Sequence, residues 1–477
     1  MTSSSDTVFD LGVVGAGPAG LAASTRAASH GASVVLVDAG TGPGGQYWRQ
    51  PLGPGIDPAE LSYLHHDLST YRRLTDLLDR QVASGTTVHL PRHQVWAATR
   101  DNGRFDLHTV DRSGTRDHLR TVTVRRLVLA TGAYDRQIPF PGWDLPGVMT
   151  AGGAQALLKG HGVVAGRRVV VAGTGPFLLP VAAGLARAGA DVVGVHEAAS
   201  PRAWLRHGAA VARNLPKLGE GLAYAAALAR HRVPVATRSV LVAAHGTEQV
   251  EAVTVVGPDG RTRRIACDTL AVGWGFTPQL ELPLALGCAT RVAEDGSLVV
   301  QVDDDQRTTV DDVFVAGETC GVGGAALAVV EGDIAGASAA GVQHADRRRR
   351  RQRDAARRFA AAMHQAHPVP TAWTSRLEPE TVVCRCEEVT ADHLHRAVDG
   401  LGAADARSAK LLARTGMGWC QGRVCGYAVA CLTAAWSDTP RSPEMLAGRP
   451  IAAPVPLGLL AAEHHRRQGP PDRSEET

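Results

Sequence analysis

A glycine-rich turn near residue 15 constrains this chain more than any other feature. Residues 10–38 read DLGVVGAGPAGLAASTRAASHGASVVLVD, which predicts an apolar strand, a turn, an alanine-rich helix and a second strand. In such a turn the first glycine allows a tight bend, the second lets the backbone approach a ligand, and the third lets the helix pack on the strand. The unit therefore predicts an α/β fold built on a parallel sheet. The turn consists of Gly15, Ala16, Gly17, Pro18, Ala19 and Gly20.

The same unit predicts a dinucleotide-binding site. The helix points its unpaired N–H groups toward the turn, where they can bind phosphate. Asp38 closes the second strand, so its carboxylate can accept hydrogen bonds from an adenosine ribose and would repel a 2′-phosphate. A glycine-rich turn without a ligand is the alternative, and the flanking strand, helix and acid argue against it.

A second copy of the unit occupies residues 168–197, RVVVAGTGPFLLPVAAGLARAGADVVGVHE. This repeat indicates an internal duplication, in which a second dinucleotide-binding domain is inserted into the first. Aligning the copies places Gly173 on Gly15, Gly175 on Gly17 and Gly189 on Gly31.

The second copy departs from the pattern at two positions. Leu178 replaces the third glycine, and His196 falls at the position of Asp38, with Glu197 one residue later. Glu197 is therefore the candidate for contacting a ribose. Three interpretations stay open, namely a working NAD(P) site, a weak adenine-nucleotide site and a structural relic.

Cysteines gather in the last quarter of the chain. Cys384-x-Cys386 is followed by Cys420 and Cys425, which makes two close pairs. Four thiolates in two pairs suit a 2Fe–2S cluster or zinc, and the gap in the first pair counts against zinc, which spaces its cysteines by about two to four residues. A degenerate domain without metal is the third interpretation. The segment between the pairs opens with the capping residue Thr390 and predicts short helices that bring the pairs together.

Composition argues against nucleic-acid binding, and the sequence shows no signal for secretion or membrane insertion. Aromatic residues make up 4% of the 477 residues and the formal net charge is +3, which does not favour a nucleic-acid-binding surface. The arginines at 347–351 are therefore expected to belong to a solvated helix that leaves the nucleotide-binding domains. Neither a signal peptide nor an apolar run of transmembrane length is recognisable, so we expect a cytoplasmic protein.

Three further segments resemble the two-dinucleotide-binding-domain flavoproteins, the family with the glutathione-reductase-like fold. Residues 125–133, RRLVLATGA, and 311–325, DDVFVAGETCGVGGA, resemble two strands of that family, and 42–50, GPGGQYWRQ, resembles its loop beside FAD. The resemblance implies FAD at the first site, although Glu318 stands where the family has aspartate. The paired cysteines of the disulfide reductases are missing, so dithiol chemistry is not expected. The implied FAD contacts are Gly45, Gln46, Ala130, Thr131, Gly132, Gly317 and Glu318.

The resemblance also implies how the domains are arranged. The cysteine domain resembles the bacterioferritin-associated-ferredoxin type of 2Fe–2S domain, in the Cys-x4-Cys variant that some flavoproteins carry as an appendage, with Cys384, Cys386, Cys420 and Cys425 as ligands. The expected parts are a discontinuous FAD domain at 1–150 and 285–345, a second dinucleotide-binding domain at 151–284, a linker helix at 346–372, the cysteine domain at 373–460 and a disordered tail at 461–477.

One group of enzymes is resembled along almost the whole chain, from about residue 8 to 460. Residues 132–162, GAYDRQIPFPGWDLPGVMTAGGAQALLKGHG, resemble the segment between the nucleotide domains in the A or alpha subunits of opine oxidases, in hydroxyproline and proline dehydrogenases and in the B subunit of hydrogen cyanide synthase. The alpha chain of sarcosine oxidase shares it more loosely. Lys159 and His161 of this segment are expected to be solvated loop side chains, and no catalytic residue is assigned.

This resemblance implies the electron-transferring subunit of a heteromeric dehydrogenase. A partner subunit of the amino-acid-oxidase type, itself containing FAD, would oxidise the C–N bond of a small amino acid or amine, and electrons would pass to a downstream acceptor. Two other classes stay open. One is a stand-alone NAD(P)H-dependent FAD and iron–sulfur reductase, and the other is a non-catalytic assembly subunit that carries cofactors.

Overall fold

The computed structural model describes residues 7–51, 59, 61–208, 215–342, 346–443, 448–449 and 451–468. Its first sheet contains β1 (Phe9–Val14), β2 (Val34–Val37), β3 (Thr87–Leu90), β4 (His93–Asp101), β5 (Arg104–Asp111), β6 (His118–Leu129) and β19 (Val313–Val315). The strand order is β3-β2-β1-β6-β5-β4, and β19 also pairs with β6. All pairs are parallel except those of β4 with β5 and of β5 with β6. The α/β fold expected from the sequence is confirmed.

The helices α1 (Pro18–Ala28) and α8 (Ala325–Ala339) pack closely on each other and on this sheet, with α2 (Leu68–Ala83) beside them. In α8, a Cβ at Gly332 or Gly336 would lie 2.1 or 2.2 Å from backbone oxygens of α1. Only glycine lets the two helices come this close. Their contact holds the amino-terminal end of α1, and with it the first glycine turn, against the segment that follows β19.

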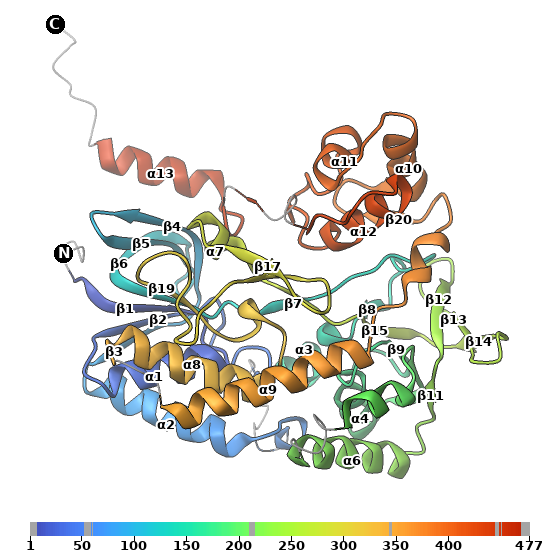
Figure 1. The fold of residues 1–477 in the computed structure, drawn as a ribbon, viewed down its shortest axis with the longest axis horizontal. Coiled ribbons are helices and arrows are strands. Elements are labelled where there is room, and N and C mark those ends of the chain that lie inside the picture. The colour runs from blue at the N-terminus through green and yellow to red at the C-terminus, as the bar shows by residue number, and fades with distance from the viewer. Residues whose placement is uncertain are drawn as a thin grey trace, which may run out of the picture.

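The second copy of the strand–turn–helix unit forms its own parallel sheet, with the order β11-β10-β9-β15-β8 (Figure 1). Two short antiparallel strands, β7 (Ala133–Asp135) and β16 (Phe276–Pro278), connect it to the first sheet. The strands of the second sheet are β8 (Val148–Thr150), β9 (Arg168–Gly173), β10 (Asp191–Glu197), β11 (Val235–Thr237) and β15 (Thr269–Gly273), and its helices are α3 (Ala151–His161), α4 (Leu178–Arg187) and α6 (Leu215–Arg230).

Smaller elements complete the two nucleotide-binding units. A three-stranded meander extends from the second sheet, and a short helix and a hairpin lie near the first. The meander consists of β12 (Val240–His245), β13 (Ala252–Val256) and β14 (Thr262–Ala266), the short helix is α7 (Glu281–Ala285), and the hairpin is β17 (Thr290–Val292) with β18 (Leu298–Val300).

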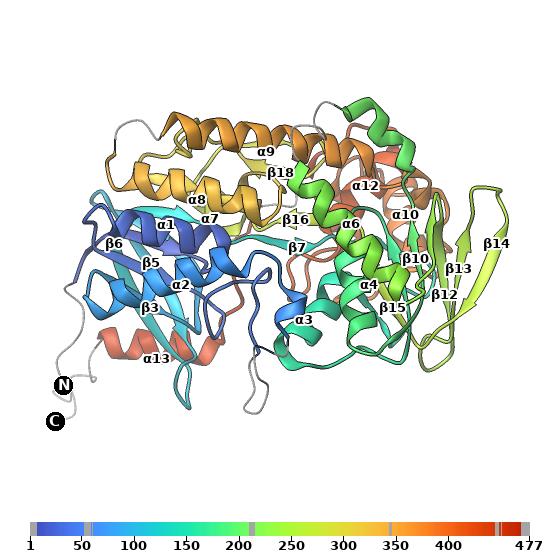
Figure 2. The same cartoon turned by 90° about the horizontal axis from the view of Figure 1, so that it is seen from below.

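The arginine-rich segment forms α9 (Arg347–Ala366), which lies alongside α8 in both views (Figures 1 and 2). Arg353 is only 2% exposed and donates to the carboxylate of Asp304 at 2.7 Å. Arg357 donates to the buried carboxylate of Glu331 at 2.8 Å. Three of the five arginines at 347–351 are exposed, as the prediction of a solvated helix requires. The helix does not leave the nucleotide-binding domains, however, because later arginines of α9 pair with acids of those domains, and that part of the prediction is wrong.

The cysteine domain follows as a separate cluster of helices, at the upper right of Figure 1. Its elements are β20 (Val382–Cys384), β21 (Val389–Thr390), α10 (Ala391–Asp399), α11 (Ala406–Ala413) and α12 (Gly426–Ser437). Thr390 caps α10 by accepting from the backbone N–H of His393 at 3.3 Å, as its sequence position predicts. Trp143, from the segment that leads to the second sheet, donates from Nε1 to the carbonyl oxygen of Val382 at 2.6 Å and ties the domains together.

The chain continues past the cysteine domain as α13 (Leu457–Gln468). This helix corrects the prediction that disorder begins at residue 461; residues 469–477 lie outside the described residues. No helix in the described part of the chain combines the length and the apolar character needed to cross a membrane.

Candidate functional site

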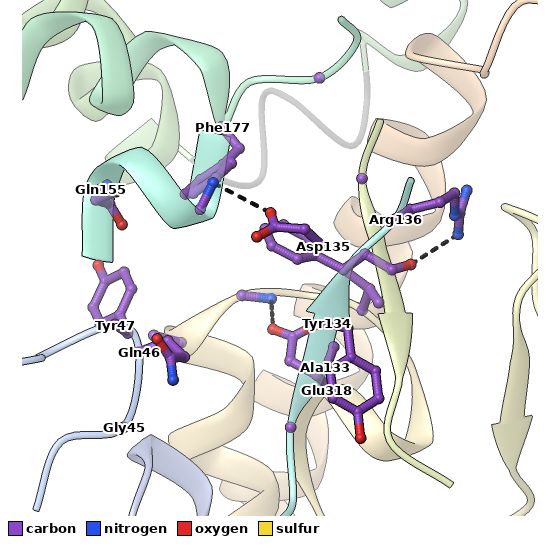
Figure 3. A pocket seen from close by; sticks show the side chains of 18 of the residues that line it. Gly45, Gln46, Tyr47, Ala133, Tyr134, Asp135, Arg136, Gln155, Phe177 and Glu318 are labelled. Carbon is purple, nitrogen blue, oxygen red and sulfur yellow. Dashed lines mark hydrogen bonds between the residues drawn. The ribbon is translucent and has the colours of Figure 1, made fainter. Parts of the chain in front are cut away.

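One cavity of about 2260 Å³ connects all three domains. Its lining includes Gly15 and Gly17 of the first turn, Gly175 of the second, and Cys420 of the cysteine domain. Ligand sites for one small molecule usually measure about 300–1,000 Å³, so this cavity has room for more than one. Figure 3 shows its middle, with Tyr47 and Gln155 on one side and Tyr134 and Glu318 on the other.

The first turn has the geometry of a dinucleotide site. A Cβ at Gly20 would lie 1.7 Å from the carbonyl oxygen of Gly15, so glycine is required there for α1 to pack on β1. Gly17 has only Gly45 near its missing Cβ, at 3.9 Å, and borders the cavity. Asp38 accepts from the backbone N–H of Ala16 and of Gly40, each at 2.6 Å. These residues fit the pyrophosphate and ribose of a dinucleotide such as FAD.

Most of the other residues that resemblance assigns to FAD line the same cavity. Ala19, Gly45, Gln46, Ala130, Thr131, Gly132, Gly317 and Glu318 border it together with Gly15, Gly17, Pro18 and Asp38. Ala16 and Gly20 belong to the same turn but are not among the described residues that line the cavity. The contacts of all these residues with FAD remain predictions. The structure brings residues from the segments 42–50, 125–133 and 311–325 to the same cavity.

Glu318 lies in a 3₁₀ turn, Gly317–Cys320, at the end of β19. Its carboxylate accepts from the backbone N–H groups of Gly323 and Gly324 at 3.0 and 2.8 Å. Gly324 precedes α8, so the glutamate binds the amino-terminal end of that helix. Burial raises the pKa of Glu318 to about 7, against the effect of these two hydrogen bonds.

The second turn repeats the arrangement of the acid in the first. Glu197 accepts from the backbone N–H of Gly175 and of Ala199, both at 2.8 Å, and from the hydroxyl of Thr174 at 3.0 Å. Asp38 likewise accepts from the turn and from the residue two positions after itself. Glu197 is thus the structural counterpart of Asp38. Burial alone would raise the pKa of Glu197, but the neighbouring His367 and the hydrogen bonds from Ala199 and Gly175 bring it below its ordinary value.

A β-bulge explains why simple alignment placed His196 at this position. The register between β10 and β9 shifts between Val192 and Gly194, so β10 holds one additional residue. His196 stays inside the sheet, buried, with Nδ1 2.8 Å from the hydroxyl of Ser239. The bulge moves Glu197 to the end of the strand.

Other features of the second site differ from the first. The helix α4 begins at Leu178, and the N–H groups of Leu178 and Leu179 make i to i+3 bonds of 3.2 Å in the turn before it. These bonds occupy N–H groups that could otherwise bind phosphate. His367, just after α9, places Nδ1 3.5 Å from Glu197, and Phe177 packs on Phe276 with ring centroids 5.1 Å apart. NAD(P) binding here remains a prediction.

The four predicted cysteine ligands lie together at the edge of the cysteine domain. Cys384 accepts from the backbone N–H of Gly416 at 3.5 Å. The neighbouring thiol of Cys425 is the main reason why the pKa of Cys384 falls to about 6. The helices α10 and α11 separate the two pairs in sequence and pack on α12, which begins directly after Cys425.

These soft donors suit an iron–sulfur cluster or zinc. In the described part of the chain, however, no three or more His, Cys, Asp and Glu side chains are already arranged to hold a metal ion. The cluster and its ligands therefore remain a prediction.

A buried ion cluster connects the segment Cys420–Cys425, called here the thiol loop, to the nucleotide-binding domains. Glu281 of α7 is 5% exposed and lies 2.8 Å from Nε of Arg423 and 3.0 Å from Nη1 of Arg449. Tyr134 of β7 donates to the same carboxylate at 3.1 Å. Arg423 stands between Cys420 and Cys425, so this cluster fixes the thiol loop at the cavity wall. A lone arginine between two cysteines gives no sequence signal for such a contact.

Lys159 corrects another sequence prediction. It lies in α3 and not in a loop, and it is 4% exposed. Its Nζ donates to the carbonyl oxygen of Tyr47 at 2.8 Å. His161, at the end of the same helix, is exposed as predicted. The available signal was the spacing of Gln155 and Lys159, which are four residues apart in a segment of mostly small and apolar residues. In the structure both border the cavity.

Comparison with known proteins extends this picture. The family model for pyridine nucleotide-disulphide oxidoreductases matches residues 9–346. Hydrogen cyanide synthase subunit HcnB of Pseudomonas aeruginosa is 32% identical, over 87% of this chain and 90% of the relative. The A subunit of opine oxidase from Agrobacterium tumefaciens is 33% identical, over 96% of this chain and 92% of the relative.

Among solved structures, L-proline dehydrogenase from P. horikoshii has a similar fold. The TM-score is 0.66 at 19% identity, and the match covers 95% of this chain and 79% of the other. The predicted family and fold are confirmed: the chain belongs to the pyridine nucleotide-disulphide oxidoreductase family and, within it, to the group that contains HcnB and the A subunit of opine oxidase.

Proposed function

We propose that this chain is the FAD- and 2Fe–2S-dependent electron-transferring subunit of a heteromeric dehydrogenase, acting in the cytoplasm. The enzyme would oxidise the C–N bond of an amino acid or secondary amine of the opine, proline or hydroxyproline, glycine or sarcosine class. The observation that carries the proposal is the shared cavity, which extends from the glycine turn at Gly17 to Cys420.

The relatives support the heteromeric part of the proposal. HcnB and its opine oxidase counterpart are both named as subunits, and the chain aligns with nearly all of each. A partner that resembles amino-acid oxidases would then carry the substrate chemistry. The absence of an assigned catalytic acid or base in this chain is compatible with that division.

The pairing of cofactors has a physical reason. A flavin accepts two electrons together and an iron–sulfur centre accepts one at a time, so the two together convert amine oxidation into single-electron export. The chain would supply both binding sites: the glycine turn with Asp38 for the nucleotide, and Cys384, Cys386, Cys420 and Cys425 for the cluster. The ion cluster at Glu281 would keep these two binding sites in a fixed relative position.

Copurification tests the proposal. A tagged chain expressed with its neighbouring genes, and purified without oxygen, should bring down a second flavoprotein and contain FAD, iron and acid-labile sulfide. Amine-dependent dye reduction should need both chains. A chain that holds neither FAD nor iron would favour a non-catalytic role in assembly, and stoichiometric zinc without iron would contradict the cluster.

A second candidate function follows from Glu197, which has the position of a ribose-binding acid. In that case the chain would be an NAD(P)H-dependent reductase that passes electrons through FAD to the iron–sulfur centre. Rapid mixing with NADH or NADPH distinguishes the two candidates. Fast bleaching of the flavin favours the reductase, and an unreactive flavin favours the amine dehydrogenase.

A further inference from the structure

Lys159 is a buried cation on the wall of the cavity. The helix α3 presents Gln155 and Lys159 to it, one turn apart. The loop that carries Gln46 and Tyr47 lies next to Gln155 (Figure 3). Besides the hydrogen bond to the Tyr47 carbonyl, the ammonium lies 5.6 Å from the centre of the Tyr47 ring. An ammonium has three donors, and the structure gives one of them a protein acceptor.

No negative charge of the described residues balances this lysine. None of the ion pairs that these residues form includes Lys159, and the charge that acts on it is that of Arg49. Burial and Arg49 together lower the pKa of Lys159 to about 8. His65 lies near as well, and burial followed by the charge of Lys159 lowers its pKa to about 4. His65 is therefore neutral at pH 7, and the two cations Lys159 and Arg49 lie together. Buried charges in proteins are normally paired, so these two cations indicate a missing anion.

Arg49 adds a second observation that points to a ligand. Its side chain packs over Gly160, where a Cβ would lie 3.2 Å from Cδ, and Nη2 donates to the side-chain oxygen of Gln46 at 2.6 Å. The Nε atom of Arg49 is buried and has no hydrogen-bond partner among the described residues. Asp38, whose charge acts on Arg49, is itself bound by backbone amides of the glycine turn. An unpaired donor and an unpaired cation therefore border one part of the cavity.

We propose that Lys159 and Arg49 form an anion-binding subsite, which takes a carboxylate or phosphate group of a ligand in this cavity. The subsite is on the α3 side of the cavity, next to Gly45 and Gln46. It does not depend on the proposed electron relay, because it requires neither the thiols nor a partner subunit. Two sources of the anion are possible in chemical terms, the phosphates of FAD itself and a separate small ligand such as an amino-acid carboxylate.

The test compares Lys159→Met with the native chain, with Lys159→Arg as the variant that keeps the charge and Lys410→Met of α11 as the control. Melting temperature is measured in Tris buffer with increasing inorganic phosphate or acetate, and FAD affinity is measured on apoprotein. Without added anion, Lys159→Met should be at least as stable as the native chain, because an apolar side chain of similar shape replaces an unpaired charge. Lys159→Met should lose at least about tenfold in FAD affinity, or in the affinity for phosphate or acetate that the rise in melting temperature reports. Lys159→Arg should retain most of the affinity that Lys159→Met loses.

The pattern of loss identifies the source of the anion. Weaker FAD binding assigns the subsite to the FAD phosphates. Unchanged FAD affinity with a lost acetate or phosphate response assigns it to a separate ligand. The native response should also weaken as pH rises above 8, where Lys159 loses its proton while Arg49 stays charged and Tyr47 and His65 stay neutral.

Native FAD affinity together with a native anion response in Lys159→Met would overturn the proposal. If that variant does not fold, Arg49→Met provides the same comparison. These outcomes are independent of iron content and of partner binding, so failure of the subsite and failure of the proposed function can be told apart.

Discussion

Gly17 and Gly20 face different neighbours, so their roles in the first turn can be separated. A methyl group at Gly17 would meet only the Cα of Gly45 at 3.9 Å, whereas one at Gly20 would clash with the Gly15 carbonyl at 1.7 Å. Gly17→Ala should change the free energy of unfolding by less than about 0.5 kcal/mol. It should weaken FAD binding at least about tenfold, because the methyl group enters the space of the pyrophosphate. Gly20→Ala should cost about 1–3 kcal/mol.

Urea unfolding of both apoproteins and fluorescence titration with FAD measure these effects. A Gly17→Ala chain with native FAD affinity would place the pyrophosphate elsewhere, and equal destabilisation by both variants would contradict the close packing of α1 on β1.

Glu318 should make the stability of the FAD-free chain depend on pH. Burial raises its pKa from 4.5 to about 7, so between these pH values the folded chain keeps a proton that the unfolded chain has lost. The stability contributed by this proton is full below pH 4.5 and is lost as pH rises to 7. Glu318→Gln cannot ionise, and it should therefore gain stability relative to the native chain over this range. Urea unfolding of both proteins at pH 5 and pH 8 measures the difference, and a constant difference would contradict the raised pKa.

Sequence spacing predicts the residues of the first site better than those of the second. Asp38 follows a regular strand, so counting from Gly15 leads to the acid that accepts from the first turn. Glu197 follows a strand with a bulge near Val192, and one additional residue moves every later position by one. A bulge arises from strand pairing across a sheet, which the order of residues along one strand does not contain.

At the level of elements, the ion cluster between α7 and the thiol loop should contribute strongly to stability. Removing the acid of a buried ion cluster leaves its cations unpaired, so Glu281→Gln should cost about 3 kcal/mol. The control is Arg414→Ala in the same cysteine domain. Arg414 pairs with Glu387 at 2.9 Å but is 67% exposed, and its loss should cost less than about 1 kcal/mol.

Urea unfolding of the two variants measures this difference. A cost for Glu281→Gln as small as that for Arg414→Ala would mean that the thiol loop is not held by this cluster.

Two helices show what element-level prediction misses. The strand and helix pattern of both nucleotide units could be predicted from apolar runs and glycines, and Thr390 marks the start of α10. The packing of α9 could not, because a run of arginines indicates a solvated face unless acids are known to lie opposite. Here Asp304 and Glu331, distant in sequence from Arg353 and Arg357, provide those acids. The burial of Lys159 in α3 depends in the same way on a tertiary contact, with Tyr47.

For the whole molecule, the decisive feature is the arrangement of the domains around one cavity. The duplicated glycine turns predict two dinucleotide-binding units, and the cysteine pairs predict a separate metal-binding unit. Neither predicts that Gly17, Gly175 and Cys420 border the same space. That depends on contacts between domains, such as those of Trp143 and Arg423, which have no local sequence pattern.

Electron transfer within one chain requires FAD at the first site and a 2Fe–2S cluster at the four thiols to be present together. Electron paramagnetic resonance detects the reduced cluster, because a 2Fe–2S centre that has taken up one electron carries an unpaired spin. Anaerobic chain loaded with FAD is reduced with dithionite and its spectrum is recorded at low temperature, with Cys384→Ala as the control.

We expect a rhombic signal from a reduced 2Fe–2S centre in the native chain and its loss in Cys384→Ala, with FAD retained in both. A chain that holds FAD but gives no such signal would contradict the electron relay.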